Sequence, residues 1–301
     1  LEVPREQLDQ ALADLEPGLR SVLEEAAENI RAFHRRQVQN GFIISGKPGI
    51  VLGQKVTPIE KVGVYIPGGT APLPSTVLMD CIPAKIAGCH EIVMVSPPTC
   101  NGDIAPIILA AARIAGVDRV FRCGGAQAIA ALAYGTESIP RVDKIVGPGN
   151  AFVAEAKRQV FGKVGIDMIA GPSDILVIAD GGSDARQIAA DLLSQAEHDQ
   201  NACAVLVTNS RPLAEAVAAE LEKQLAVLPR RETARASLER SGKIILVKDI
   251  LEAIRIANAL APEHLELCVD DPFAWLGQVK NAGSIFLGRS CPEALGDYLA
   301  G

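Results

Sequence analysis

Two short polar segments in the second half of the chain contain residue types that perform acid–base chemistry and bind metals. In the first segment, Glu263 and His264 are adjacent and follow Pro262, which ends a predicted helix. Because the unperturbed pKa of a histidine side chain lies close to neutrality, an imidazole beside a carboxylate can move protons at physiological pH. The sequence therefore indicates a general base at this point.

The other polar segment closes a predicted helix over residues 185–196. Gln195 and His198 have i, i+3 spacing, which places both side chains on one side of a helix. Asp297, near the end of the chain, can supply a carboxylate oxygen to the same site. One nitrogen donor with oxygen donors suits zinc or manganese. The spacing alone favours the alternative, a histidine that interacts favourably with a helix C-terminus.

Three glycine-rich turns follow predicted strands in the first half of the chain. They are residues 65–70, 123–128 and 147–150. Backbone amides in such turns can approach a phosphate group at a helix N-terminus. None of the turns has the full G-x-G-x-x-G fingerprint, because Phe152 occupies the third small position of the best match. Tight turns without a ligand are the alternative, but Tyr65, Gln127 and Asn150 offer stacking and hydrogen bonds and favour a loosely held nucleotide.

Composition limits the classes of function. A chain of 301 residues with 49% hydrophobic content can bury a large core, and two domains are expected. A net charge of -7 without a long Lys/Arg run argues against a nucleic-acid partner and against an anionic membrane surface. The seven cysteines include no C-x-x-C pair, no apolar stretch reaches membrane-spanning length, and residues 1–5 do not resemble a signal peptide. We therefore expect a cytoplasmic protein with a small-molecule partner.

The elements that position these residues follow from apolar periodicity. Residues 6–37 have helical spacing, interrupted at Pro17-Gly18. Strands are predicted at residues 62–66, 91–96, 119–123 and 144–146, and again at 175–179, 204–208, 243–247, 265–269 and 284–287. Helices are predicted between them at residues 76–87, 104–115, 126–134, 185–196, 212–224 and 250–260. The pattern indicates an α/β fold with two doubly wound parallel-sheet domains, and a helical N-terminal segment that packs on one of them.

From Val64 onward the chain resembles histidinol dehydrogenase, the zinc- and NAD-dependent enzyme of the last steps of histidine biosynthesis. The resemblance rests on motifs that occur in order along the chain, at residues 63–69, 86–89, 124–129, 146–150, 170–173, 195–198, 261–266, 281–288 and 296–298. It implies two incomplete dinucleotide-binding-type domains. The implied division is residues 1–64 plus 174–301 as one discontinuous domain, with residues 65–173 inserted.

The resemblance also implies site residues. Gln195, His198 and Asp297 match zinc ligands, while Glu263 and His264 match the acid–base pair. The implied substrate contacts are Ser173, Gln195, His198, His264 and Asp297, and the implied NAD contacts are Tyr65, Gln127 and Asn150.

Members of this family are homodimers whose chains extend beyond both ends of this sequence. Their C-terminal extension contains an Asn-His-Val-Leu-Pro segment and a tail histidine that binds the zinc of the partner subunit. A protein with only these 301 residues is therefore expected to bind zinc weakly and to show little activity.

The implied reaction is the oxidation of L-histidinol to L-histidine through a bound aldehyde, with two NAD reduced. His264 takes the hydroxyl proton as hydride leaves, and Glu263 activates water for the second oxidation. A covalent thiol at Cys123 or Cys89 is a competing chemistry for the oxidation of the aldehyde, and it requires a thiolate. The alternatives are a related zinc/NAD dehydrogenase of another small polar alcohol, and a non-catalytic fragment that binds a nucleotide or metal.

Overall fold

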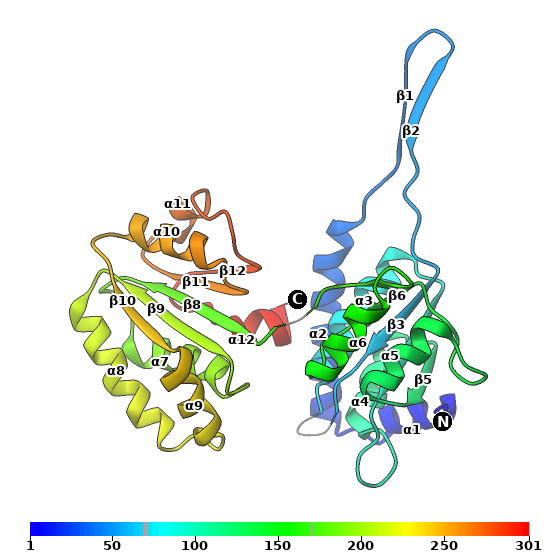
Figure 1. Cartoon of the computed structure of the whole chain (residues 1–301), viewed down its shortest axis with the longest axis horizontal. Helices are drawn as coiled ribbons and strands as arrows, with labels where there is room; N and C mark the ends of the chain where they lie inside the picture. Colours follow the sequence, from blue (N-terminus) through cyan, green and yellow to red (C-terminus); the bar gives the residue numbers. More distant parts are fainter. Residues whose placement is uncertain (69–71, 170, 301) are drawn as a thin grey trace. The chain divides into compact units, whose positions relative to one another are not determined.

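The computed structural model describes residues 1–68, 72–169 and 171–300, apart from the side chains of Asp297 and Tyr298. The chain forms two compact units (Figure 1). Unit 1 comprises Leu1–Ala170 with Tyr298–Gly301, and unit 2 comprises Gly171–Asp297. Each unit contains a five-stranded parallel sheet with helices on its faces, which confirms the predicted fold class.

The sheet of unit 1 has the strand order β5-β4-β3-β6-β7. Its strands are β3 (Lys61–Tyr65), β4 (Glu91–Ser96), β5 (Arg119–Arg122), β6 (Lys144–Val146) and β7 (Gly165–Ile166). Renumbered from the first strand of the sheet, the order is 3-2-1-4-5, which is the dinucleotide-binding order without its sixth strand. The order reverses between β3 and β6, so their carboxyl ends form the edge at which such folds bind ligands.

Helices cover both faces of this sheet. On one face lie α1 (Arg5–Ala13), α2 (Pro17–His34), α3 (Pro74–Ala87) and α4 (Pro106–Ala115), and on the other α5 (Gly125–Tyr134) and α6 (Ala151–Val160). Because successive strand residues point to opposite faces, Val64 packs in the core beneath α3 and α4, whereas Tyr65 packs beneath α5.

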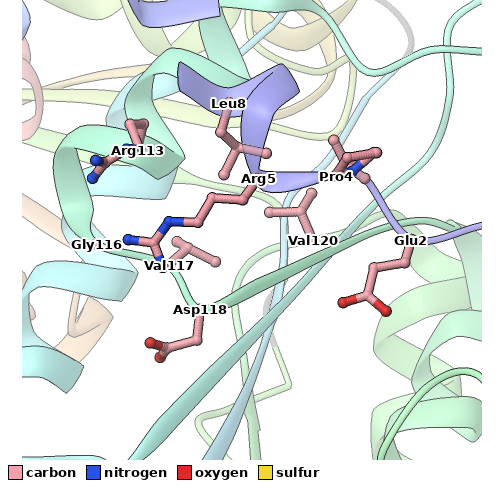
Figure 2. A pocket seen from close by; sticks show the side chains of 10 residues that line it. Glu2, Pro4, Arg5, Leu8, Arg113, Gly116, Val117, Asp118 and Val120 are labelled. Atoms are coloured by element: carbon pink, nitrogen blue, oxygen red, sulfur yellow. The ribbon is translucent and has the colours of Figure 1, made fainter. Parts of the chain in front are cut away.

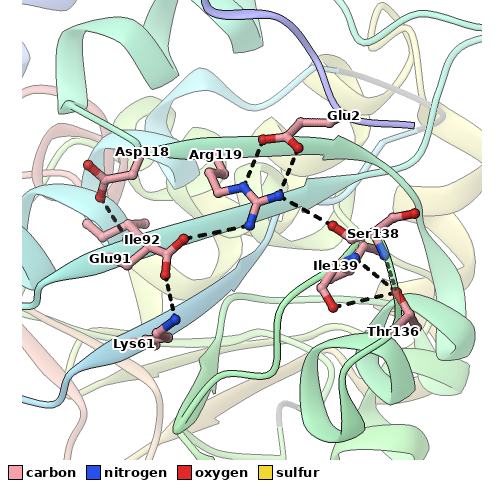
Figure 3. Close-up of polar contacts among 9 residues, drawn as sticks. All are labelled: Glu2, Lys61, Glu91, Ile92, Asp118, Arg119, Thr136, Ser138 and Ile139. Carbon is pink, nitrogen blue, oxygen red and sulfur yellow. Dashed lines mark hydrogen bonds and ion pairs between the residues drawn. The ribbon is translucent and has the colours of Figure 1, made fainter.

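The N-terminal segment packs on unit 1, as the periodicity predicts. Pro17 begins α2, and the Glu16 carboxylate accepts hydrogen bonds from the first free amides of that helix. Glu2 forms a bridge with Phe121 beside β5, and Arg119 donates two hydrogen bonds of 2.8 Å to its carboxylate (Figure 3). This paired geometry attaches the chain start to the edge of the sheet.

The compact units therefore group residues 1–64 with residues 65–170. The predicted division instead groups residues 1–64 with 174–301, and its boundary after residue 64 falls inside β3. That division stays a prediction.

Unit 2 repeats the strand order of unit 1. Its order β10-β9-β8-β11-β12 is again 3-2-1-4-5. The strands are β8 (Asp174–Ala179), β9 (Cys203–Thr208), β10 (Lys243–Leu246), β11 (His264–Cys268) and β12 (Ser284–Leu287). One face carries α7 (Ala185–Ala196), α8 (Arg211–Leu225) and α9 (Arg231–Ser241), and the other carries α10 (Ile250–Leu260) and α11 (Pro272–Leu276). The short α12 (Glu293–Leu295) and η2 (Gly296–Ala300) follow the last strand.

An antiparallel hairpin follows the 3-10 turn η1 (Arg35–Gln37), and the sequence analysis did not anticipate it. Strands β1 (Phe42–Lys47) and β2 (Ile50–Gln54) pair with each other, and every residue in them is exposed. The hairpin extends away from the rest of unit 1 (Figure 1). It contributes nothing to the core of that unit.

A cavity lies beside the N-terminal segment. It has a volume of ≈ 280 Å³ and is lined by residues such as Pro4, Leu8, Arg113 and Val120 (Figure 2). None of the predicted site residues lines this cavity.

Gly147, directly after β6, is a position where the fold requires glycine. Its φ is 106°, and an added Cβ atom would lie 2.2 Å from the Tyr65 carbonyl oxygen. We predict that Gly147→Ala lowers the free energy of unfolding by about 2–5 kcal/mol, from left-handed strain plus overpacking. Gly162→Ala is the matched control, because Gly162 also has a positive φ but open space around it. Urea denaturation of both variants measures the difference, and equal losses would contradict the steric argument.

Candidate active site

His264 is the first residue of β11 and lies at the amino-end edge of the sheet of unit 2. The residue is 7% exposed, and Nδ1 lies 3.0 Å from the Asp174 carbonyl oxygen. Because a carbonyl oxygen can only accept, Nδ1 must carry the proton and donate it. Nε2 is therefore the nitrogen that can act as a base.

The backbone around Glu263 is held on both sides. Its amide donates to Asp174 Oδ1 at 2.6 Å, and its carbonyl oxygen accepts from the Ser284 amide at 2.8 Å. Ala261, after the end of α10, adopts a left-handed conformation with φ 52°, which costs free energy in a non-glycine residue. Two neighbouring strands and a strained turn thus fix the exposed Glu263 beside the buried His264.

Three acidic residues, Asp191, Glu266 and Glu293, form a cluster next to His264 on the inner side of the sheet edge. Glu266 is fully buried, and its side chain is hydrogen-bonded to that of Asp191 on α7. Its Oε1 also accepts a hydrogen bond from the Glu293 amide at 2.8 Å, while Glu293 Oε1 lies 3.9 Å from His264 Nε2. The sequence analysis missed this cluster. Its signal was an acidic residue at Glu266, inside an otherwise apolar strand.

Burial sets the protonation of this cluster. Burial, followed by the negative charge of Asp191, raises the pKa of Glu266 well above its usual range, and burial likewise raises the pKa of Asp191. Two adjacent carboxyl groups in a buried site cannot both ionise without a large cost. The Glu266–Asp191 pair therefore holds a proton near neutral pH.

The contact between Glu266 and Asp191 also indicates where Gln195 lies. Gln195 follows Asp191 by four residues on α7, and His264 precedes Glu266 by two residues on β11, so each step stays on one face of its element. This places Gln195 near His264. Its side chain is buried, and its Oε1 has no hydrogen-bond partner among the described residues. A buried carbonyl oxygen without a donor fits the requirement for a metal ligand.

The remaining predicted residues of this site are less completely placed. Ser173 directly precedes β8, and the exposed His198 follows α7, so both lie at the same amino-end edge as His264. The backbone of Asp297 lies in η2, but its side chain lies outside the described residues. Within the part of the chain that the structure describes, no three His, Cys, Asp or Glu side chains are arranged to hold a metal. The zinc site stays a prediction.

The predicted nucleotide contacts gather in unit 1, at the carboxyl-end edge of its sheet. The hydroxyl of Tyr65, at the end of β3, accepts a hydrogen bond of 3.0 Å from the Gly125 amide. Gln127 is exposed in the first turn of α5, which begins at that glycine. Asn150 caps α6 by accepting two backbone N–H groups. Gly147 contacts Tyr65, so the three glycine-rich turns meet around Tyr65. Residues 69 and 70 of the turn at 65–70 lie outside the described residues.

The equivalent edge of unit 2 is filled by a side chain. The guanidinium group of Arg289 pairs with Asp180 and with Asp270, at 2.6 Å from the latter, after the ends of β8 and β11. An added Cβ atom at Gly182 would lie 2.7 Å from Arg289 Nη2. The glycine turn after β8 therefore contacts an arginine whose charge is neutralised by two carboxylates. A phosphate group at this edge would need hydrogen-bond donors that are not already paired.

The thiol chemistry considered for aldehyde oxidation finds no support. Burial raises the pKa of the Cys89 thiol and of the Cys123 thiol, so both favour the protonated form. A nucleophilic cysteine requires the opposite shift.

Comparison with known proteins assigns the chain to a family. The family model of histidinol dehydrogenase matches residues 1–301. The chain belongs to the histidinol dehydrogenase family. It is 56% identical over 299 residues to histidinol dehydrogenase of Pseudomonas syringae pv. syringae, an alignment that covers 99% of this chain and 66% of that protein. It is 54% identical over 301 residues to the Syntrophotalea carbinolica enzyme, covering 100% and 70%.

A solved structure of a histidinol dehydrogenase family member, from Elizabethkingia anophelis, matches with a TM-score of 0.96 and 41% identity, covering 100% of this chain and 70% of that one. An aldehyde dehydrogenase of Sinorhizobium meliloti matches with a TM-score of 0.55 at 15% identity, which shows a shared fold alone. The chain spans about two thirds of the length of the curated histidinol dehydrogenases that it matches.

The described helices include none that is both long and apolar enough to cross a membrane.

We predict that Glu266→Gln reduces the loss of stability at alkaline pH. A pKa raised on folding gives stability that is complete at low pH and is lost as the pH rises through the folded-state value. Glutamine keeps a polar side chain next to Asp191 but cannot ionise. The free energy of unfolding of the variant should therefore fall less than that of the wild type between about pH 5 and pH 9. Glu239→Gln, at an exposed position, is the control, and a wild-type pH slope in Glu266→Gln would contradict the shared proton.

Proposed function

We propose that this chain is the larger part of an enzyme that oxidises L-histidinol to L-histidine through a bound aldehyde, with two NAD reduced. The observation that carries the proposal is the buried His264, whose Nδ1 donates to the Asp174 carbonyl oxygen, so that Nε2 is the basic nitrogen of the ring. Membership in the histidinol dehydrogenase family supports the choice of substrate.

Acid–base chemistry is the part of the reaction that this chain supplies. In the first oxidation, His264 Nε2 accepts the hydroxyl proton while the carbon-bound hydrogen leaves as hydride to NAD. In the second, the exposed Glu263 carboxylate accepts a proton from water, which adds to the aldehyde before another hydride leaves. Ser173, at the same edge of the sheet, would contact the substrate. Tyr65, Gln127 and Asn150 would contact NAD.

Zinc is part of this proposal. Gln195, His198 and Asp297 would hold it, and Gln195 Oε1, which has no hydrogen-bond partner among the described residues, supports this assignment. When bound, zinc supplies a Lewis acid that binds and orients the amino alcohol. Because Gln195 is a neutral donor, the complete enzyme needs a further ligand for tight binding, and the resemblance points to a histidine of the partner subunit.

A homodimer and a cytoplasmic location complete the proposal. The hairpin β1–β2 supports the dimer, because it carries apolar side chains that no core covers. Ile43 is 79% exposed, Val51 is 70% exposed and Leu52 is 59% exposed. An extended hairpin with exposed aliphatic side chains is typical of a surface that a partner covers. The family's biosynthetic role supports the cytoplasmic location.

Another small polar alcohol is the alternative substrate within the same chemistry. Steady-state assays of the full-length enzyme with L-histidinol, simple diols and sulfonated diols would separate the two. Higher kcat/KM on a compound other than L-histidinol would move the assignment to that substrate. A protein that binds NAD or zinc but turns over none of these alcohols would be a non-catalytic relative.

We predict that His264→Asn and Glu263→Gln each lower kcat of the full-length enzyme by about two or more orders of magnitude, because each removes a proton acceptor. The zinc content should stay at the wild-type value, since neither residue is a proposed ligand. Steady-state kinetics and atomic absorption measure the two quantities. His90→Asn, at an exposed position in unit 1, is the control. Wild-type turnover in His264→Asn would end its assignment as the base.

We predict that Ile43→Lys combined with Val51→Lys weakens the dimer of the full-length enzyme by about 100-fold or more, because two charges replace apolar contacts at its interface. Sedimentation velocity over a concentration series measures the dissociation constant. Val227→Lys is the control, because Val227 is 83% exposed but lies outside the hairpin. A dimer of wild-type strength in the double variant would exclude the hairpin from the interface.

A further inference from the structure

Lys157 is a buried charged residue that the proposed chemistry does not use. It lies on α6 in unit 1 with 2% of its surface exposed, and it forms an ion pair with Asp167, which follows β7. Lysine is rarely buried this completely, because an ammonium group loses much free energy when it leaves water. Its burial therefore indicates a specific structural task.

The Lys157–Asp167 ion pair holds both backbone groups of one residue. Lys157 Nζ donates to the Gly147 carbonyl oxygen at 3.0 Å, and Asp167 Oδ2 accepts from the Gly147 amide at 2.8 Å. Gly147 has the positive φ described above, so its peptide groups point in directions that an ordinary strand end does not use. The ion pair satisfies both groups in that conformation.

This turn connects two of the proposed NAD contacts. Gly147 lies against the carbonyl group of Tyr65, and three residues later Asn150 caps α6. Lys157 stands two turns further along the same helix, so its side chain ties the body of α6 back to the turn that precedes it. A shift of Gly147 would move Asn150 relative to Tyr65.

Asp80 on α3 adds a second carboxylate to this cluster. Its Oδ2 is buried and has no hydrogen-bond partner within the described residues. Burial, and next the negative charge of Asp167, raise the pKa of Asp80 to about 7, whereas Lys157 opposes the shift. The Asp80 carboxyl group therefore lies close enough to Asp167 and Lys157 to interact with the charges of both.

We propose that Lys157 and Asp167 are positioning residues for the nucleotide site, and that they fix the Gly147 turn, and with it Asn150, in the conformation that binds NAD. The inference rests on the proposed function, because it takes Tyr65 and Asn150 as NAD contacts. It predicts that NAD binding depends on a cluster that never touches NAD.

Two variants of the full-length enzyme separate positioning from folding. Lys157→Met removes the ammonium group but keeps an unbranched apolar stem of similar size. The double variant Lys157→Met/Asp167→Asn removes both charges, so no uncompensated carboxylate remains and stability should recover. The donor to the Gly147 carbonyl is lost in both. Arg158→Met is the control, because the exposed neighbour on α6 pairs with Glu155 and does not contact Gly147.

We expect KM for NAD to rise about tenfold or more in both variants, with kcat and KM for L-histidinol within about twofold of the wild type. The melting temperature of the double variant should lie closer to that of the wild type than that of the single variant does. An NAD KM within about twofold of the wild type in the folded double variant would overturn the proposal. So would an equal rise in both Michaelis constants.

Hydrogen exchange without NAD separates this proposal from the proposed function. Amides of residues 147–153 should exchange about tenfold faster or more in both variants, while those of β4 stay protected. Unchanged exchange at these amides would overturn the positioning role, even if the wild type reduces NAD normally. The wild type could fail to use NAD while the amides of residues 147–153 still exchange faster in both variants. That result would refute the nucleotide site, and with it the role of the cluster in NAD binding.

Discussion

The parallel pairing of β8 with β11 is the constraint on which the proposed acid–base site depends. It sets His264 opposite Ile175, so the imidazole meets the carbonyl group of Asp174, while the Asp174 side chain receives the Glu263 amide. Residues separated by about 90 positions thus define one tautomer and one backbone conformation. The next inward position on the same face of β11 is Glu266, whose pairing with Asp191 fixes α7 and brings Gln195 towards the site.

The two units share one strand order, but the proposed sites lie at opposite edges of their sheets. In unit 1 the glycine turns at the carboxyl ends of the strands leave Asn150 and Gln127 exposed. In unit 2 the corresponding edge is closed by Arg289, and the residues proposed to be catalytic lie at the amino ends of the strands instead. A shared topology is therefore insufficient to locate function, and the chemistry of each edge decides it.

Much of the fold could be predicted from the sequence, because buried parallel strands and amphipathic helices have distinct periodicities. The predicted bounds of β4, α7 and β12 agree with the structure. The hairpin β1–β2 was missed, since neither of its faces is buried and no alternation marks it. The pairs Lys157–Asp167 and Glu266–Asp191 could not be found, because each joins residues whose proximity depends on tertiary packing.

The candidate site was predictable in part for the same reason. Residues that are adjacent in the sequence, such as Glu263 and His264, can be recognised as a pair from the sequence alone. The sequence does not show what surrounds them, such as the carbonyl group that orients His264. Nor does it show that Gln195 Oε1 lacks a hydrogen-bond partner in the described part of the chain. The resemblance to a family supplied the grouping of distant residues, and the structure supplies the physical reason why several of them lie at one edge.

The burial of Glu266 has a consequence for kinetics. The residue is fully enclosed by β11, α7 and the backbone of Glu293, so water has no direct access to its carboxyl group. A proton can enter or leave this position when unit 2 opens locally, or through the neighbouring polar side chains. After a sudden change in pH, the cluster would therefore equilibrate more slowly than the surface carboxylates. The protonation state behind His264 would then reflect the recent history of the protein as well as the pH around it.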